Sequence, residues 1–101
     1  MSKSVIINNL KEDLRRINRN IEMYKKKIAK FPQGYLREKK INGKSYYYLR
    51  KRYGEKIKDK YVKKEDVEEV KMGVKKRRFI EDNLKRLLEQ KKYIEKILKN
   101  K

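Results

Sequence analysis

Hydrophobic residues recur at alternating steps of three and four along residues 4 to 30. The series runs Ile7, Leu10, Leu14, Ile17, Ile21, Tyr24 and Ile28. Such spacing is typical of a helix that buries one narrow stripe. Pro32 disfavours helical backbone at the residue before it, and Gly34 permits a sharp exit. The pattern therefore predicts a helix over 4–30.

Residues 35 to 62 change from the helical period to an alternating one, which is typical of strands. Two turn signals divide this segment. Asn42-Gly43 suits a two-residue type I′ turn, and Gly54-Glu55 suits type II′, in which glycine takes the first position. We therefore predict a three-stranded antiparallel meander over 35–62.

From residue 64 the helical period returns. Four acidic residues occupy positions 65–69, where the positive end of a helix dipole favours negative charge. Two apolar stripes follow: Val67, Val70 and Val74 first, then Ile80, Leu84, Leu87, Ile94 and Leu98. Their phase slips at Arg77, and Met72-Gly73 suits a bend. We predict a short helix near 64–72 and a long helix near 74–99.

These elements predict a single α+β domain over 1–101. Two long helices, about 4–30 and 74–99, form an antiparallel pair, with the meander and the short helix between them in the chain. Two helices alone leave part of each apolar seam exposed to water. The pattern therefore leaves open whether the helices form a homodimer or whether the sheet or another molecule covers the remainder.

Composition adds a strong positive field. Charged residues make up 47% of the chain against 37% hydrophobic ones, and the net charge is +19 at pH 7. Such a field attracts polyanions, so nucleic acid is the expected partner and an anionic membrane is the competing one. No segment approaches the ~18 consecutive apolar residues that a membrane-spanning helix needs. The apolar run near the start of the sequence is too short for a signal peptide. We expect a cytoplasmic protein that does not bind a membrane.

The chain has no Cys and no His, which excludes disulfides, zinc knuckles, thiol chemistry and imidazole acid–base catalysis. Adjacent carboxylates such as Glu81 and Asp82 point in different directions on a helix and have basic neighbours, so they are interpreted as surface charge. No tyrosine is marked as an activated nucleophile. We expect a non-enzymatic protein that needs no metal or cofactor.

The alternation of the meander predicts which side chains share a face. With Leu49 and Ile57 as apolar anchors, the inner face includes Tyr35, Ile41, Tyr47, Tyr53 and Tyr61. The outer face then carries Lys40, Tyr46, Tyr48, Arg50, Arg52, Lys56, Lys58 and Lys60. Basic surfaces with interleaved aromatic rings are a recurring design for binding phosphates and bases. The alternative is an ordinary solvated sheet face, but residues 31–63 hold eleven Lys and Arg against three acids.

A second basic cluster occupies residues 75–78, with Lys71 nearby. It is either a phosphate clamp beside the sheet or a solvated helix face. Together with Lys44 in the first hairpin, the two clusters define the predicted site. The predicted nucleic-acid-binding residues are Lys40, Lys44, Tyr46, Tyr48, Arg50, Arg52, Lys56, Lys58, Lys60, Lys75, Lys76, Arg77 and Arg78.

Residues 34–70, GYLREKKINGKSYYYLRKRYGEKIKDKYVKKEDVEEV, resemble the arm-type DNA-binding module of phage tyrosine recombinases. The matching features are Gly34, the Asn42-Gly43-Lys44 turn, the aromatic central strand, Gly54 and the acidic helix start. In that family the sheet enters the major groove. The resemblance implies reading roles for Tyr46, Tyr48, Arg50, Arg52, Lys58 and Lys60, and it implies no recombinase activity because the chain lacks the catalytic domain.

The sequence thus predicts a small basic protein that binds DNA or RNA through its sheet. The alternative is a phage-type inhibitor or accessory protein that binds a larger nucleoprotein enzyme at its nucleic-acid groove or bound RNA. A third hypothesis is a structural coiled-coil dimer in which only the helices matter.

Overall fold

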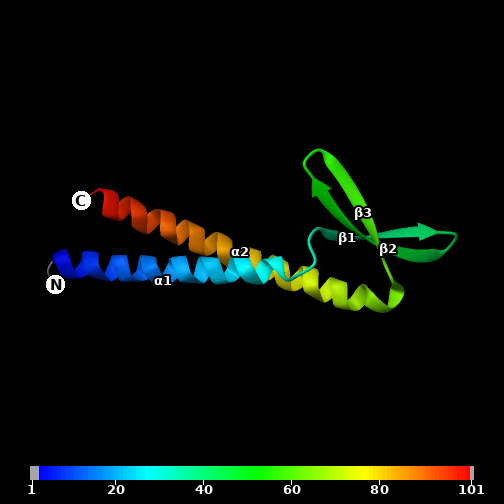
Figure 1. Ribbon diagram of the computed structural model, residues 1–101, viewed down its shortest axis with the longest axis horizontal. Helices are drawn as coiled ribbons and strands as arrows, with labels where there is room; N and C mark the ends of the chain where they lie inside the picture. Colours follow the sequence, from blue (N-terminus) through cyan, green and yellow to red (C-terminus); the bar gives the residue numbers. More distant parts are fainter. Residues whose placement is uncertain (1–2, 101) are drawn as a thin grey trace. The chain divides into compact units, whose positions relative to one another are not determined.

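The computed structural model describes residues 3–100 (Figure 1). Its elements follow one another as α1 (Lys3–Ala29), β1 (Tyr35–Ile41), β2 (Lys44–Tyr53), β3 (Lys56–Val62), the 3₁₀ turn η1 (Lys64–Asp66) and α2 (Val67–Lys99). The predicted α+β class, the two helices and the three-stranded sheet between them are confirmed.

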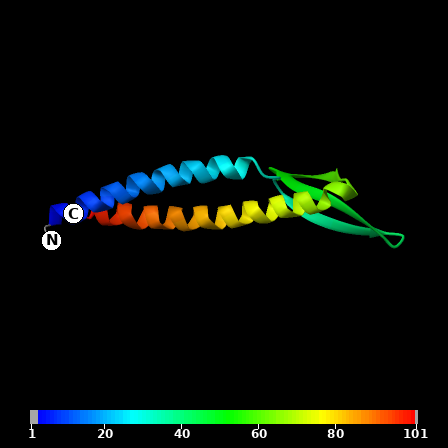
Figure 2. The ribbon, with the colours of Figure 1, turned by 90° about the horizontal axis from the view of Figure 1, so that it is seen from below.

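The chain divides into two compact units. The helical unit contains α1 up to Ile28 and α2 from Ile80, and the sheet unit spans Ala29–Phe79. Within the helical unit the two segments run antiparallel and side by side (Figures 1 and 2). Ile17 and Ile21 are buried, whereas the rest of the predicted seam of α1 is only half-buried. The seams are therefore partly exposed, and a homodimer through the helices stays a prediction.

The sheet is a meander in the order β1-β2-β3, and both of its turns have two residues. Asn42 and Gly43 both have positive φ, 52° and 78°, as a type I′ turn requires. Gly54 has φ 63° and Glu55 does not adopt positive φ, which is the pattern of type II′. Both predicted turns are confirmed.

The register assigns side chains to the two sides of the sheet. A two-residue turn places its flanking residues opposite each other, so Ile41 pairs with Lys44 and Tyr53 pairs with Lys56. Paired residues point to the same side of an antiparallel sheet. Odd-numbered residues of β2 therefore share a side with even-numbered residues of β1 and β3.

This register confirms the predicted faces of β2 and reverses those of β1 and β3. The division of β2 is confirmed, with Tyr47 and Leu49 on one side and Tyr46 and Tyr48 on the other. The assignment of β1 and β3 is wrong, because the anchor Ile57 pairs with Arg52 instead of joining Leu49. The lysines predicted to lie outward, Lys40, Lys56, Lys58 and Lys60, are on the Leu49 side, and the residues predicted to lie inward, Tyr35, Ile41, Ile57 and Tyr61, are on the Tyr48 side.

The Leu49 side of the sheet faces the first part of α2. Leu36 and Tyr47 line a pocket together with Val74 of α2, and Val62, which pairs with Tyr47, is buried. We call this the helix-facing side. We call the opposite side the outer face, and Tyr35, Ile41, Ile57 and Tyr61 on it are 44–53% exposed.

Helix α2 runs through Gly73 without interruption, so the predicted break between helices at 72–74 is wrong. Gly73 serves a different purpose. A Cβ atom at this position would lie 2.7 Å from Cδ of Pro32, so glycine is what allows the proline ring to pack on the helix. The segment that leaves α1 is thereby held against α2.

Arg77 anchors the same segment. Its side chain is buried, and its guanidinium donates hydrogen bonds to the backbone carbonyls of Pro32 and Gly34, the latter at 2.7 Å. Gly34 has φ 92°, and any side chain there would collide with the carbonyl of Arg50. The connection from α1 to β1 is therefore fixed on one side by α2 and on the other by β2.

Replacing Arg77 by Met should destabilise the sheet unit by about 2–4 kcal/mol, because two carbonyls lose charged donors. The measurement is urea unfolding followed by circular dichroism. The matched control is Arg78→Met at the exposed neighbouring position, where a change within about 0.5 kcal/mol is expected. Equal losses in the two variants would contradict the anchoring role.

Candidate nucleic-acid interface

The outer face combines cations with phenol rings. Its twelve residues include five Lys and Arg, four Tyr and one acid. They are Tyr35, Arg37, Lys39 and Ile41 of β1, Lys44, Tyr46, Tyr48, Arg50 and Arg52 of β2, and Ile57, Asp59 and Tyr61 of β3. Five of the predicted site residues therefore lie on this face: Lys44, Tyr46, Tyr48, Arg50 and Arg52.

Two tyrosines meet at the centre of this face. The rings of Tyr48 and Tyr61 lie with their centroids 5.7 Å apart at 64°, an edge-on arrangement that aromatic pairs favour. The Lys39 ammonium lies 4.8 Å from the centroid of the Tyr48 ring, within the range of a cation–π contact. Tyr61 remains 52% exposed. Its ring is therefore accessible to a stacking partner.

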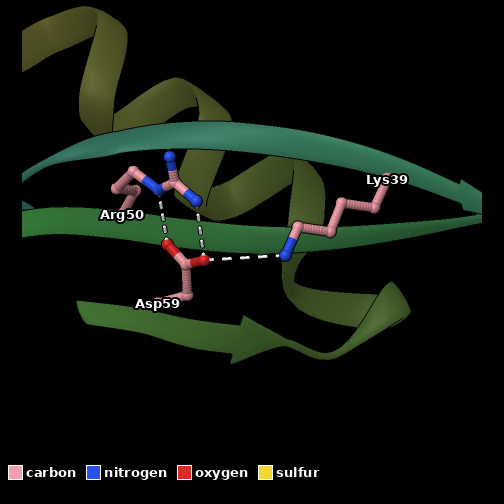
Figure 3. A network of polar contacts seen from close by, with 3 residues as sticks. All are labelled: Lys39, Arg50 and Asp59. Carbon is pink, nitrogen blue, oxygen red and sulfur yellow. Dashed lines mark hydrogen bonds and ion pairs between the residues drawn. The ribbon is translucent and has the colours of Figure 1, made fainter. Parts of the chain in front are cut away.

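An ion pair on the same face joins Arg50 of β2 to Asp59 of β3 (Figure 3). Arg50 donates two hydrogen bonds to the Asp59 carboxylate, Nε to Oδ1 at 2.7 Å and Nη2 to Oδ2 at 3.0 Å, and Lys39 Nζ lies 3.7 Å from Oδ2. The hydrogen bond from Arg50 lowers the pKa of Asp59 below its usual value, with added attraction from Lys39. The same bond raises the pKa of Arg50.

This pairing changes the interpretation of Arg50. A guanidinium that holds a carboxylate with two hydrogen bonds does not present those donors to a phosphate. Arg50 therefore organises the outer face, while Arg37 and Arg52 are exposed cations of the same face. The prediction that Arg50 contacts nucleic acid stays a prediction, and the structure adds its pairing with Asp59.

The lysines of β3 surround a different aromatic ring. On the helix-facing side, at the tip of the second hairpin, Lys51 and Lys58 place their ammonium groups 4.9 and 5.6 Å from the centroid of the Tyr53 ring. Lys56 and Lys60 point to the same side. These lysines cannot act on the same surface as Tyr48 and Arg52.

The basic cluster at 75–78 is also divided. Lys75 and Arg78 line the pocket between α2 and the helix-facing side of the sheet. Lys76 lines another hollow, which Phe31 and Pro32 share. Arg77 is buried on backbone carbonyls, so its prediction as a nucleic-acid contact is wrong.

Seven residues of the outer face were missed by sequence reasoning: Tyr35, Arg37, Lys39, Ile41, Ile57, Asp59 and Tyr61. The signal that could have found them was the length of the turns. Because each turn has two residues, the parity of the side chains changes from one strand to the next. Because Ile57 was assumed to lie on the same side as Leu49, the faces of β1 and β3 were assigned the wrong way round.

A family model described as a domain of unknown function, DUF6788, matches residues 7–72. The chain belongs to this family. The match covers most of α1, the whole meander and the start of α2. No curated protein and no solved structure matches the chain. The resemblance to arm-type DNA-binding modules therefore stays a prediction.

Two further properties bear on the kind of site. Within residues 3–100, no three His, Cys, Asp or Glu side chains come together as ligands of a metal ion would. Over the same residues, no helix has the length and apolar character needed to cross a bilayer.

The Arg50–Asp59 pair predicts a pH dependence of stability. Because the folded-state pKa of Asp59 is lowered, its contribution is present above the unfolded-state pKa of about 4 and is lost as the pH falls through the folded-state value. The difference in unfolding free energy between the unchanged chain and Asp59→Asn should be constant from pH 5 to 7 and should shrink below pH 4. A difference that does not change with pH would show that the pair contributes nothing.

Proposed function

We propose that the protein binds nucleic acid through the outer face of its sheet. The single observation that carries the proposal is the composition of that face, which has five cations and four tyrosines against one acid. Charge of one sign with interleaved rings suits a polymer of phosphates and bases.

In this proposal, the arginines bind phosphates and a tyrosine ring contacts a base or sugar. Arg37 and Arg52 are exposed and suit phosphate oxygens, which a guanidinium binds with two donors. Tyr61 offers a half-exposed ring for stacking on a base or packing on a sugar. Asp59 holds Arg50 in place and keeps one positive charge engaged within the sheet.

Specificity should be modest. Phosphate contacts fix position without reading sequence, and the exposed cations Arg37, Lys39, Lys44 and Arg52 suit such contacts. Base reading would need an arginine at a guanine edge, which a sheet achieves only inside a major groove. The proposal implies that the protein acts in the cytoplasm, where DNA and RNA are both accessible.

The decisive measurement is binding to duplex DNA, single-stranded DNA and structured RNA across a salt series. We expect a slope of log K against log salt steeper than about −3, because several counterions are released from the phosphates. Replacing Arg37 and Arg52 together by Ala should make the slope shallower by roughly 1 to 2, at about 0.7–0.9 per phosphate contact.

The matched control is Arg15→Ala with Arg19→Ala, which removes the same charge from exposed positions of α1. This control should leave the slope close to that of the unchanged chain. Asp59→Asn should act in the opposite direction and tighten binding, because it frees Arg50 and removes the acid of the outer face. Equal effects of the two arginine pairs would overturn the assignment of the face.

A second candidate function is attachment to a nucleoprotein enzyme as an inhibitor or accessory protein. It is favoured by Ile41 and Ile57, which lie on the outer face with 50% and 53% exposure. Such apolar contacts suit a protein surface better than a phosphate backbone.

A pull-down with and without nuclease separates the two functions. Direct nucleic-acid binding predicts that partners are lost when the sample is treated with nuclease. Attachment to a protein predicts that the same partner is retained after treatment and is lost in Ile41→Ser with Ile57→Ser.

A further inference from the structure

A second basic surface lies on the other side of the sheet. Between the helix-facing side and the first part of α2 there is a groove of about 470 Å³. We call it the helix–sheet groove. Its lining residues are Leu36, Glu38, Tyr47, Lys71, Val74, Lys75 and Arg78.

The groove has an apolar floor and a cationic rim. Leu36, Tyr47 and Val74 supply the floor from three different elements. The rim is supplied by α2, because Lys71, Lys75 and Arg78 are spaced by four and three residues and so share one face of the helix. A ligand that suits this groove has a flat, weakly polar part and negative charges beside it.

Glu38 is the one acid among the lining residues, and its carboxylate is already engaged. The Ser45 hydroxyl donates a hydrogen bond of 2.7 Å to Oε1 of Glu38. The remaining acceptor capacity suits a hydroxyl or amino group of a ligand. With three cations against one acid, the groove complements an anion.

The groove shares no side chain with the outer face. Neighbouring residues of a strand point to opposite sides, so Tyr47 belongs to the groove and Tyr48 belongs to the outer face. Lys40 and Lys60 add to the positive charge on the groove side. One sheet therefore separates two basic, tyrosine-bearing surfaces.

We propose that the helix–sheet groove is a second nucleic-acid site, which takes a single-stranded segment. The base and sugar lie on Leu36, Tyr47 and Val74, and the flanking phosphates lie against the rim. The groove volume falls in the range of small-molecule sites, about 300–1,000 Å³, which suits one unstacked base with its phosphates. Bases of a duplex are paired and cannot enter such a groove. The inference rests on the proposed function for its class of ligand.

The test compares two variants with equal changes in charge. The groove variant is Lys75→Glu with Arg78→Glu, and the outer-face variant is Arg37→Glu with Arg52→Glu; all four positions are exposed. Fluorescently labelled (dT)10 is titrated into each protein at low salt, and the number of strands bound per chain is measured. Circular dichroism verifies that both variants fold.

We expect two strands per unchanged chain and one per chain in each variant, with affinity for the lost strand reduced more than about tenfold. If the unchanged chain binds one strand, and only the outer-face variant fails to bind it, the groove is not a site and the proposed function stands. If the unchanged chain binds one strand, and only the groove variant fails to bind it, the groove is a site and the proposed function of the outer face is wrong. No binding by the unchanged chain would overturn both.

Discussion

The two-residue turns are the constraint on which this sheet depends. Each turn sets the residues on either side of it directly opposite each other, and that pairing then propagates along the whole ladder. A third residue in the turn at Gly54 would move every lysine of β3 to the other side. The pair between Arg50 and Asp59 would be lost in the same step, since those residues meet only because the register places them opposite each other.

The anchoring of the segment before β1 decides which side of the sheet stays open. Pro32 packs on α2 where Gly73 leaves room, and Arg77 binds two carbonyls of the same segment. These contacts bring the first part of α2 against the sheet on the Leu36 side. The cost of burying the Arg77 guanidinium is offset because backbone carbonyls satisfy it. On the opposite side, Tyr35, Ile41, Ile57 and Tyr61 remain 44–53% exposed.

The local elements were predictable because their signals are local. The helix that ends before Pro32 and the strands divided by Asn42-Gly43 and Gly54-Glu55 follow from turn chemistry and spacing. The correct pairing was also implied by the same turns. It was missed because Ile57 was treated as a core residue, whereas in the structure it is 53% exposed.

Other features depend on contacts between distant residues, which spacing alone does not reveal. Arg77 occupies the position that continues the stripe of Val67, Val70 and Val74, and a cation on an apolar stripe indicates a buried, partnered charge. Its partners lie 43 and 45 residues away in the chain, so the sequence could indicate the burial but not the carbonyls.

The lysines of β3 have a consequence for self-association. β3 is an edge strand, and its outer backbone groups are not paired within the sheet. Lys56, Lys58 and Lys60 alternate along it, so a second chain that extended the sheet at this edge would bring its own lysines against these three. The edge therefore repels copies of itself, which helps a protein with an exposed edge strand to avoid forming fibres.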